Sequence, residues 1–233
     1  PKINDTVSII QDLEKNGVDM IEIGLPFSDP LADGPTIQES STIAIENGMT
    51  TSLLFEQLKD IRELVQIPLI IMGYFNPMMQ FGMEKFCQKC AEVGIDGLII
   101  PDLPLFVYET EYKAIFEKYN LKNIFFFFFQ TSVERIQQID AISDSFIYMV
   151  SSAAVTGSQS GFGSEQMDYF KRIADLNLKN PQIVGFGIKD EETFQQATKH
   201  QKGAIIGSAF INFLKENPIE KTYSFTNYLI KKC

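Results

Sequence analysis

Two carboxyl groups near the start of the chain are placed where they could transfer protons. Glu22 lies between Ile21 and Ile23 in a short apolar run typical of a buried strand. Burial would remove water from the ionised carboxylate and raise its pKa toward neutrality, which suits a general acid or base. A structural glutamate, paired with a buried lysine or bound by backbone amides, is the alternative interpretation of Glu22.

The second carboxyl group, Asp33, follows in a loop that three prolines stiffen. If this loop covers the carboxyl end of a parallel sheet, Asp33 projects over the place where barrel enzymes carry their active sites. An aspartate just before Pro35 could also cap a helix that begins there. The two roles of Asp33 are compatible, and both stay open.

Other catalytic chemistries find little support in the sequence. His200 is the only histidine, which excludes a serine–histidine triad or a histidine-rich metal site. Cys87 and Cys90 form a C-x-x-C pair inside a helical stretch, without a second pair, and we interpret them as helix-face cysteines. We therefore expect no metal site, and acid–base work falls to carboxylates, tyrosine, lysine or cysteine.

Three glycine-containing turns come late in the chain and could hold an anion. They contain Gly157, Gly187 and Gly207, and the last is followed by Ser208 and a helical run. Glycine lets backbone amides approach a phosphate closely, and a helix N-terminus adds partial positive charge. Any one of these turns alone would be read as an ordinary turn, but three of them after consecutive late strands indicate a phosphate site.

The composition excludes several classes of protein. The chain has 233 residues, of which 45% are hydrophobic, and its formal net charge of −10 argues against a nucleic-acid partner. The longest apolar run, Ile124–Phe129, is too short to cross a membrane, and the N-terminus lacks the features of a signal peptide. Three cysteines, an odd number, indicate a reducing compartment. We expect a cytoplasmic protein, or a plastid stromal one in a photosynthetic eukaryote.

Short apolar runs alternate with amphipathic stretches, which is typical of β–α units around a parallel sheet. Strands are predicted at Met20–Ile23, Leu69–Met72, Gly97–Ile100, Asn123–Phe129, Phe146–Val150, Gln182–Gly185 and Ala204–Ile206. Helices are predicted at Thr6–Lys15, Ser52–Val65, Met83–Val93, Tyr108–Lys118, Ser132–Ile139, Ser164–Asp175, Glu191–Lys199 and Ile219–Ile230.

This pattern predicts an α/β fold, a (β/α)8 TIM barrel, as a single domain over residues 1–233. The first strand of such a barrel would come before Pro1 and is absent from the sequence given. An open doubly wound sheet is the alternative, but it usually carries a G-x-G-x-x-G turn after its first strand, and the sequence has none. Glycine turns after the last strands favour the barrel.

Further motifs lie at the ends of the predicted strands. They are the segment from Glu22 to Gln38, the Y-x-N pattern of Tyr74 and Asn76, the stretch Pro101-Asp-Leu-Pro104, and the late glycine turns. Together these motifs, over essentially the whole chain, resemble those of the tryptophan synthase α subunit family. The resemblance implies a lyase that cleaves indole-3-glycerol phosphate to indole and glyceraldehyde 3-phosphate in L-tryptophan biosynthesis.

The resemblance also implies a role for each site residue. Glu22 would be the catalytic acid–base group, Asp33 would bind the indole N–H, and Tyr148 would supply an active-site hydroxyl. Phe186 would wall the indole pocket, and Thr156 would meet Asp33 when its loop closes. The phosphate would be held by main-chain amides of Gly157, Gly187, Gly207 and Ser208.

Family resemblance further implies an α2β2 assembly with a β subunit that carries pyridoxal phosphate, with no cofactor in this chain. Asp29, Asn76 and Pro104 would lie toward that partner. Two departures from the family pattern are Ala154, where glycine is more usual, and the bulky run Phe125–Phe129. Two other interpretations stay open: a non-catalytic α-like chain that only activates a β partner, and another phosphosugar barrel enzyme.

Overall fold

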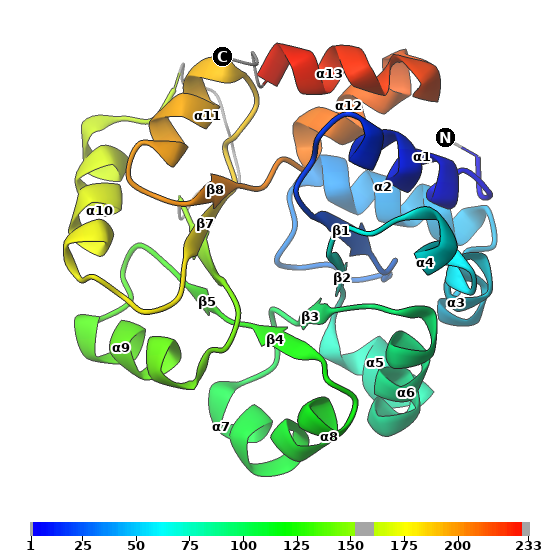
Figure 1. The fold of residues 1–233 in the computed structure, drawn as a ribbon, viewed down its shortest axis with the longest axis horizontal. Helices are drawn as coiled ribbons and strands as arrows, with labels where there is room; N and C mark the ends of the chain where they lie inside the picture. The colour runs from blue at the N-terminus through cyan, green and yellow to red at the C-terminus, as the bar shows by residue number, and fades with distance from the viewer. Residues whose placement is uncertain (1, 152–160, 230–233) are drawn as a thin grey trace.

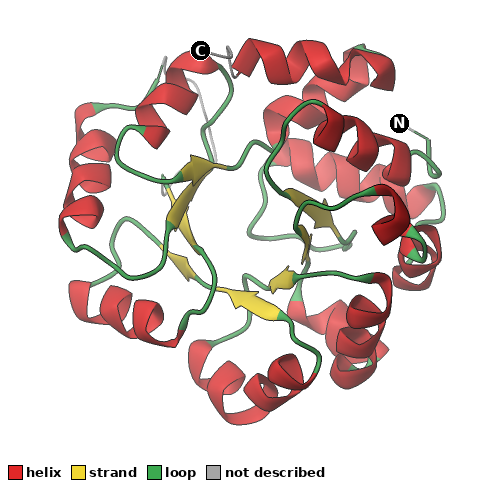
Figure 2. Ribbon diagram, in the orientation of Figure 1, coloured by secondary structure: helices red, strands yellow, loops and turns green. Residues whose placement is uncertain are grey.

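The computed structural model describes residues 2–151 and 161–229, and its elements form a ring (Figure 1). Strands stand around the middle of the ring and helices lie outside them (Figure 2), as the barrel prediction requires. The strands are β1 (Ile21–Gly24), β2 (Leu69–Met72), β3 (Gly97–Ile99), β4 (Lys122–Ile124), β5 (Phe126–Phe127), β6 (Ile147–Val150), β7 (Gln182–Gly185) and β8 (Gly203–Ala204).

All strand pairings are parallel and follow the order of the chain. One sheet has the order β1-β2-β3-β4 and the other β5-β6-β7-β8. β4 and β5 are separated only by Phe125, whose carbonyl accepts a hydrogen bond from the Tyr148 amide at 2.8 Å, so the two sheets form one continuous arc. Within the described residues no pairing joins β8 to β1, and no strand precedes the first helix.

The phenylalanine run departs from its prediction as one continuous strand. Phe126 and Phe127 form β5, but Phe128 is 54% exposed and has left the sheet. The Phe128 amide donates to the Thr131 hydroxyl at 2.8 Å, and the Thr131 amide donates back to the Phe128 carbonyl at 2.9 Å. This local turn takes the backbone groups that a longer strand would need for pairing, so the strand ends early.

One or more helices connect most consecutive strands along the chain. The helices are α1 (Thr6–Lys15), α2 (Pro35–Glu46), α3 (Thr51–Leu58), α4 (Ile61–Leu64), α5 (Phe75–Phe81), α6 (Met83–Val93), α7 (Leu105–Val107), η1 (Tyr108–Tyr112), α8 (Lys113–Lys118), α9 (Val133–Ile142), α10 (Ser164–Asp175), α11 (Glu191–Thr198), α12 (Ser208–Glu216), η2 (Ile219–Lys221) and α13 (Thr222–Leu229). The helix predicted over residues 52–65 is two helices, because Asp60 (φ −111°, ψ 16°) leaves helical geometry.

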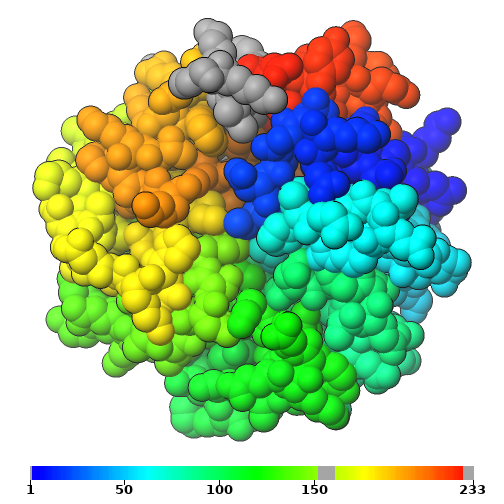
Figure 3. Space-filling model, in the orientation of Figure 1, coloured from blue at the N-terminus to red at the C-terminus, as the bar shows by residue number. Residues whose placement is uncertain are grey.

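Apolar side chains form two separate clusters, one on each side of the strand ring. Leu98 belongs to the larger cluster between strands and helices, whereas its neighbour Ile99 belongs to the smaller one inside the ring. This alternation follows from the two-residue period of a strand. Side chains fill much of the space inside the ring that the ribbons leave open (Figure 3). In the part of the chain that is described, no helix is long and apolar enough to cross a membrane.

Candidate active site

Glu22 faces the inside of the ring. Its neighbours Ile21 and Ile23 pack into the outer apolar cluster, so strand alternation turns Glu22 inward. The prediction that both faces of this strand are buried is wrong, because solvent reaches Glu22 from the interior. Protein groups nevertheless surround its carboxyl, and this enclosure, followed by the charge of Asp33, raises its pKa from 4.5 to about 7. The predicted direction of the pKa shift is confirmed.

Asp33 is held by a tyrosine from the next strand unit. The Tyr74 hydroxyl donates a hydrogen bond to Asp33 Oδ2 at 2.8 Å and accepts one from the Ala32 amide, also at 2.8 Å. Burial raises the pKa of Asp33, and the Tyr74 hydrogen bond opposes that rise. Asp33 does not cap the following helix, because Gly34 occupies the N-cap position of α2. Its carboxylate therefore has no local structural task at the start of that helix.

Tyr148 points from β6 into the ring and lies close to both carboxyl groups. Burial raises the pKa of Tyr148 well above its usual value, and the charges of Glu22 and Asp33 raise it further. Its side chain is possible only because residue 185 is glycine: a Cβ atom there would lie 2.0 Å from the Tyr148 hydroxyl oxygen. Gly185, the last residue of the predicted strand Gln182–Gly185, thus makes room for a tyrosine from the neighbouring strand.

Aromatic rings form a row beside this centre. The Tyr148 ring lies 4.8 Å from Phe126 and 6.2 Å from Phe186, measured between ring centroids. Phe186 has a positive φ of 69°, and the Ser151 hydroxyl donates to its carbonyl at 2.6 Å, which fixes this unusual backbone. The row offers a flat apolar wall next to two carboxyl groups.

The late glycine turns come at the carboxyl ends of β7 and β8. Gly187, Gly207 and Ser208 are all exposed there. Ser208 begins α12, and Gly207 is its N-cap residue, so free amides of a helix start point out of this end of the ring. The strands are parallel, which puts these turns at the same end as the Asp33 loop. Thr156, Gly157 and Ala154 lie outside the described residues.

The chain is similar to known proteins over nearly its whole length. A family model described as tryptophan synthase alpha chain matches residues 1–232. The chain belongs to this family. A tryptophan synthase alpha chain from Flavobacterium johnsoniae is 72% identical over 225 residues, covering 97% of this chain and 89% of the relative. One from Bacteroides thetaiotaomicron is 56% identical over 216 residues, covering 93% and 84%.

Solved structures agree with the family assignment. A structure of the tryptophan synthase α2β2 complex from Pyrococcus furiosus matches with a TM-score of 0.89 and 30% identity, covering 98% of this chain and 93% of that one. The alpha subunit from Legionella pneumophila matches with a TM-score of 0.84 and 29% identity, covering 97% and 85%. The fold is thus the (β/α)8 barrel of the family, and the chain is a carbon–carbon lyase of tryptophan biosynthesis.

The residues predicted to face a partner subunit are exposed at the ends of three consecutive strand units. Asp29 lies in the loop after β1, Asn76 in the first turn of α5 after β2, and Pro104 just before α7 after β3. Two large apolar side chains lie near them in sequence, Leu31 at 89% exposure and Phe106 at 73%. Sequence analysis missed these two, because nothing in a sequence tells an exposed leucine from a buried one.

The remaining polar and reactive groups do not form a second centre. No group of three metal-ligating side chains occurs in the residues described. Cys87 and Cys90 are buried in the outer apolar layer, where burial raises the pKa of Cys87 to about 12 and that of Cys90 as well. Their assignment as helix-face cysteines is in keeping with this position.

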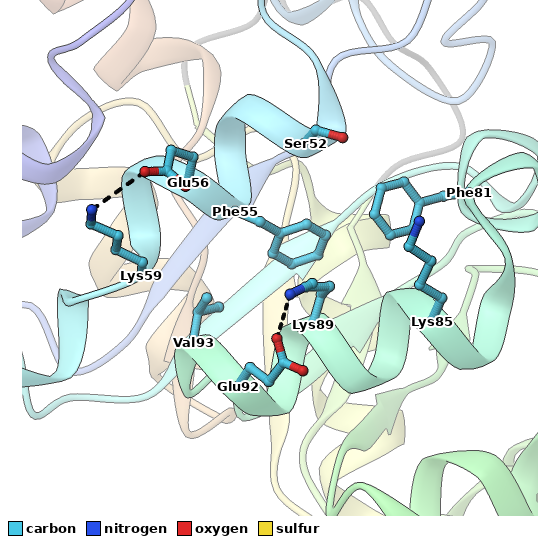
Figure 4. Close-up of a pocket in the computed structure, with 9 residues that line it drawn as sticks. All are labelled: Ser52, Phe55, Glu56, Lys59, Phe81, Lys85, Lys89, Glu92 and Val93. Atoms are coloured by element: carbon cyan, nitrogen blue, oxygen red, sulfur yellow. Dashed lines mark hydrogen bonds and ion pairs between the residues drawn. The ribbon is translucent and has the colours of Figure 1, made fainter.

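A groove on the outside of the ring lies between α3 and α6 (Figure 4). Two of its lysines are paired with neighbouring carboxylates, Lys59 with Glu56 at 3.3 Å and Lys89 with Glu92 at 2.5 Å. Since these helices lie outside the strands while Glu22 faces inward, the groove is separate from the carboxyl pair. We place the candidate active site inside the ring, because Glu22 faces that space and Tyr148 lies close to both carboxyl groups there.

The functional residue that sequence reasoning missed is Tyr74. It entered only as part of a Y-x-N motif, without a task of its own. Its contact with Asp33 joins residues 41 positions apart, and only the parallel pairing of β1 with β2 brings them together.

Proposed function

We propose that Glu22 and Asp33 are the acid–base pair with which this alpha chain cleaves indole-3-glycerol phosphate. The observation that carries the proposal is the Glu22 carboxyl, which faces the ring interior and has a pKa of about 7. At this pKa both ionisation states are populated near neutral pH. One group can then give a proton in one step and take one in the next.

The chemistry needs both of these transfers. Protonated Glu22 would give its proton to the indole carbon that carries the glycerol chain. The resulting Glu22 carboxylate would take the proton of the adjoining hydroxyl as the carbon–carbon bond breaks. The bonding pair returns to the ring to give indole, the hydroxyl carbon becomes the aldehyde of glyceraldehyde 3-phosphate, and Glu22 is protonated again.

The Asp33 carboxylate would accept a hydrogen bond from the indole N–H while the protonated ring carries a positive charge. Its carboxylate is close enough to Glu22 for its charge to raise the pKa of that residue. Tyr148 would supply a hydroxyl at the same centre, and the effect of both carboxylates on its pKa supports this position. Phe186 would wall the indole pocket as part of the aromatic row.

The phosphate would be held by the late glycine turns, through main-chain amides of Gly157, Gly187, Gly207 and Ser208. Exposure of the last three and the helix start at Ser208 support this site, because a helix N-terminus favours an anion. Thr156 would meet Asp33 on closure of its loop.

The partner would be a tryptophan synthase β subunit in an α2β2 complex, with pyridoxal phosphate in the β subunit only. Exposed Asp29, Asn76 and Pro104 would face it, and the apolar surfaces of Leu31 and Phe106 support a protein contact at this end of the ring. Residues 1–233 would act as one barrel domain in the cytoplasm.

The deciding experiment measures indole release from indole-3-glycerol phosphate, with and without the β subunit. Glu22→Gln should lower kcat by about 100- to 10,000-fold, the range that a general acid–base group contributes. Glu46→Gln, at the exposed end of α2, is the matched control and should turn over as the unmodified chain does. Turnover retained in Glu22→Gln, with the fold intact by circular dichroism, would remove Glu22 from this role.

A further inference from the structure

The loop that carries Asp33 is held by side chains of α2 and by Tyr74. Gln38 of α2 donates to the Asp33 carbonyl at 2.9 Å, which fixes the backbone but not the carboxylate. Near the start of the loop, the Phe27 amide donates to the Ser41 hydroxyl at 2.8 Å, and that hydroxyl donates to the Phe27 carbonyl at 2.9 Å. Near its end, the only side chain from outside the loop and α2 that the described structure bonds to it is Tyr74. The position of the Asp33 carboxylate therefore depends on Tyr74.

Tyr74 is itself held rigidly. It is 6% exposed and its ring lies 5.2 Å from the ring of Phe27, centroid to centroid. It directly precedes α5, whose first amide, that of Phe75, donates to Asp102 Oδ1 at 2.8 Å. A side chain packed on one face and anchored by the following residue can aim its hydroxyl accurately.

The direction of the two hydrogen bonds is determined by counting protons. A tyrosine hydroxyl has one hydrogen, and the Ala32 amide can only donate, so it occupies a lone pair of the Tyr74 oxygen. The single hydroxyl hydrogen is then directed at Asp33 Oδ2. The other carboxylate oxygen, Oδ1, makes no hydrogen bond to any described residue. It can therefore accept a hydrogen bond from a ring N–H.

We propose that Tyr74 is a positioning residue for Asp33, which fixes one carboxylate oxygen so that the other faces the indole N–H of the substrate. The proposal rests on the proposed function, in which Asp33 accepts that N–H. Tyr74 does not touch the reacting atoms in this scheme and acts only through Asp33. Its hydroxyl also keeps Asp33 ionised, because donation to a carboxylate favours the charged form.

The test is Tyr74→Phe, which keeps the ring and removes both hydrogen bonds. In the complex with the β subunit, kcat for indole release should fall about tenfold to a hundredfold, as expected for a lost hydrogen bond to a charged group. KM should change much less. In a plot of kcat against pH, the acid limb should move to higher pH, because the pKa of Asp33 rises when the Tyr74 hydrogen bond is lost.

Two further variants separate positioning from a general loss of structure. Tyr169→Phe removes the hydroxyl of another buried tyrosine, one that has no hydrogen-bond partner among the described residues, and should leave kcat and the pH profile unchanged. In an Asp33→Ala background, adding Tyr74→Phe should cost no more than about twofold, because the group through which Tyr74 acts is already gone.

Wild-type kcat and an unmoved acid limb in Tyr74→Phe would overturn the proposal. The proposal would also be overturned if Tyr74→Phe lowered kcat by the same factor in the unmodified chain and in the Asp33→Ala variant. Failure of the proposed function has a different signature: the unmodified complex would release no indole, or Asp33→Ala would release it at the wild-type rate.

Discussion

The two ends of the strand ring use polar side chains in different ways. At the amino end, Arg62 donates to the carbonyls of Gly94 and Ile67 at 2.7 Å each and pairs with Asp96. Glu14 accepts the amides of Gln66 and Ile67 there, at 2.7 and 3.0 Å. These groups bind backbone in the turns before β2 and β3, so their hydrogen bonds hold the turns together.

At the carboxyl end, the carboxyl groups of Glu22 and Asp33 accept no backbone amide of the described residues. Tyr74 bonds to Asp33, and Glu22 is exposed toward the ring interior and has a pKa of about 7. Carboxyl groups without a full set of partners cost stability but remain available to a substrate. We infer from this comparison that Arg62 and Glu14 at the amino end stabilise the fold, whereas Glu22 and Asp33 at the carboxyl end remain available to a substrate.

Gly185→Ala is expected to have the largest effect on the carboxyl end of the ring. The new Cβ would lie 2.0 Å from the Tyr148 hydroxyl, so the tyrosine must move out of the site. We expect kcat for indole release to fall at least about tenfold and stability to fall by about 1–3 kcal/mol, as in overpacked cores. Gly203→Ala in β8, where the nearest atom is 3.8 Å away, is the control that should change neither. Full activity in Gly185→Ala would mean that Tyr148 has no part in the reaction.

Arg62→Ala tests the amino end. It removes the hydrogen bonds to three backbone carbonyls, those of Gly94, Val65 and Ile67, and the ion pair with Asp96, and we expect a loss of about 1–3 kcal/mol in the free energy of unfolding by urea. Indole release below the melting range should stay at the wild-type rate. Arg135→Ala is the matched control, since Arg135 bonds to the Gln138 side chain at 3.4 Å on the surface of α9. If kcat fell by more than the fraction of folded protein, the inference that Arg62 at the amino end serves only the fold would be contradicted.

A smaller effect is expected in the pH dependence of stability. The folded state holds the Glu22 proton up to about pH 7, while the unfolded chain loses it near 4.5. Stability from this group is therefore present below 4.5 and is lost as pH rises to about 7. Because solvent reaches Glu22, we expect on the order of 1 kcal/mol.

The measurement compares thermal unfolding of the unmodified chain with that of Glu22→Gln across this range. Relative to the variant, the unmodified chain should lose stability between pH 4.5 and 7 and stay level above it. Parallel curves would show that the pKa of Glu22 is the same in the folded and unfolded chain.

Local patterns in the sequence predicted most of the strands correctly. The run Leu69–Met72 is β2 and the run Gln182–Gly185 is β7, because continuous apolar stretches of this length suit strands covered on both faces. The phenylalanine run failed this reasoning, since the Thr131 side chain captured the Phe128 amide and ended the strand. A side chain competing for one backbone group is too local an event for apolar periodicity to reveal.

The candidate site was predicted in part. Glu22 was singled out, and loss of hydration raises its pKa as expected, but its strand is not covered on both faces, because Glu22 is exposed toward the ring interior. Asp33 was found in the correct loop and the helix begins at Pro35 as predicted, but Asp33 does not cap it, because Gly34 occupies the N-cap position. Cap positions depend on backbone angles that residue types alone do not specify.

The sequence by itself determined where most strands and several helices lie, and that two carboxyl groups lie near the end of the strand Ile21–Gly24. Those features depend on residues close together in the chain. The tertiary structure alone decided that Tyr74 holds Asp33 and that Gly185 makes room for Tyr148. Each of these contacts joins different strand units, and their distance is set by the parallel pairing of strands, which no local pattern encodes.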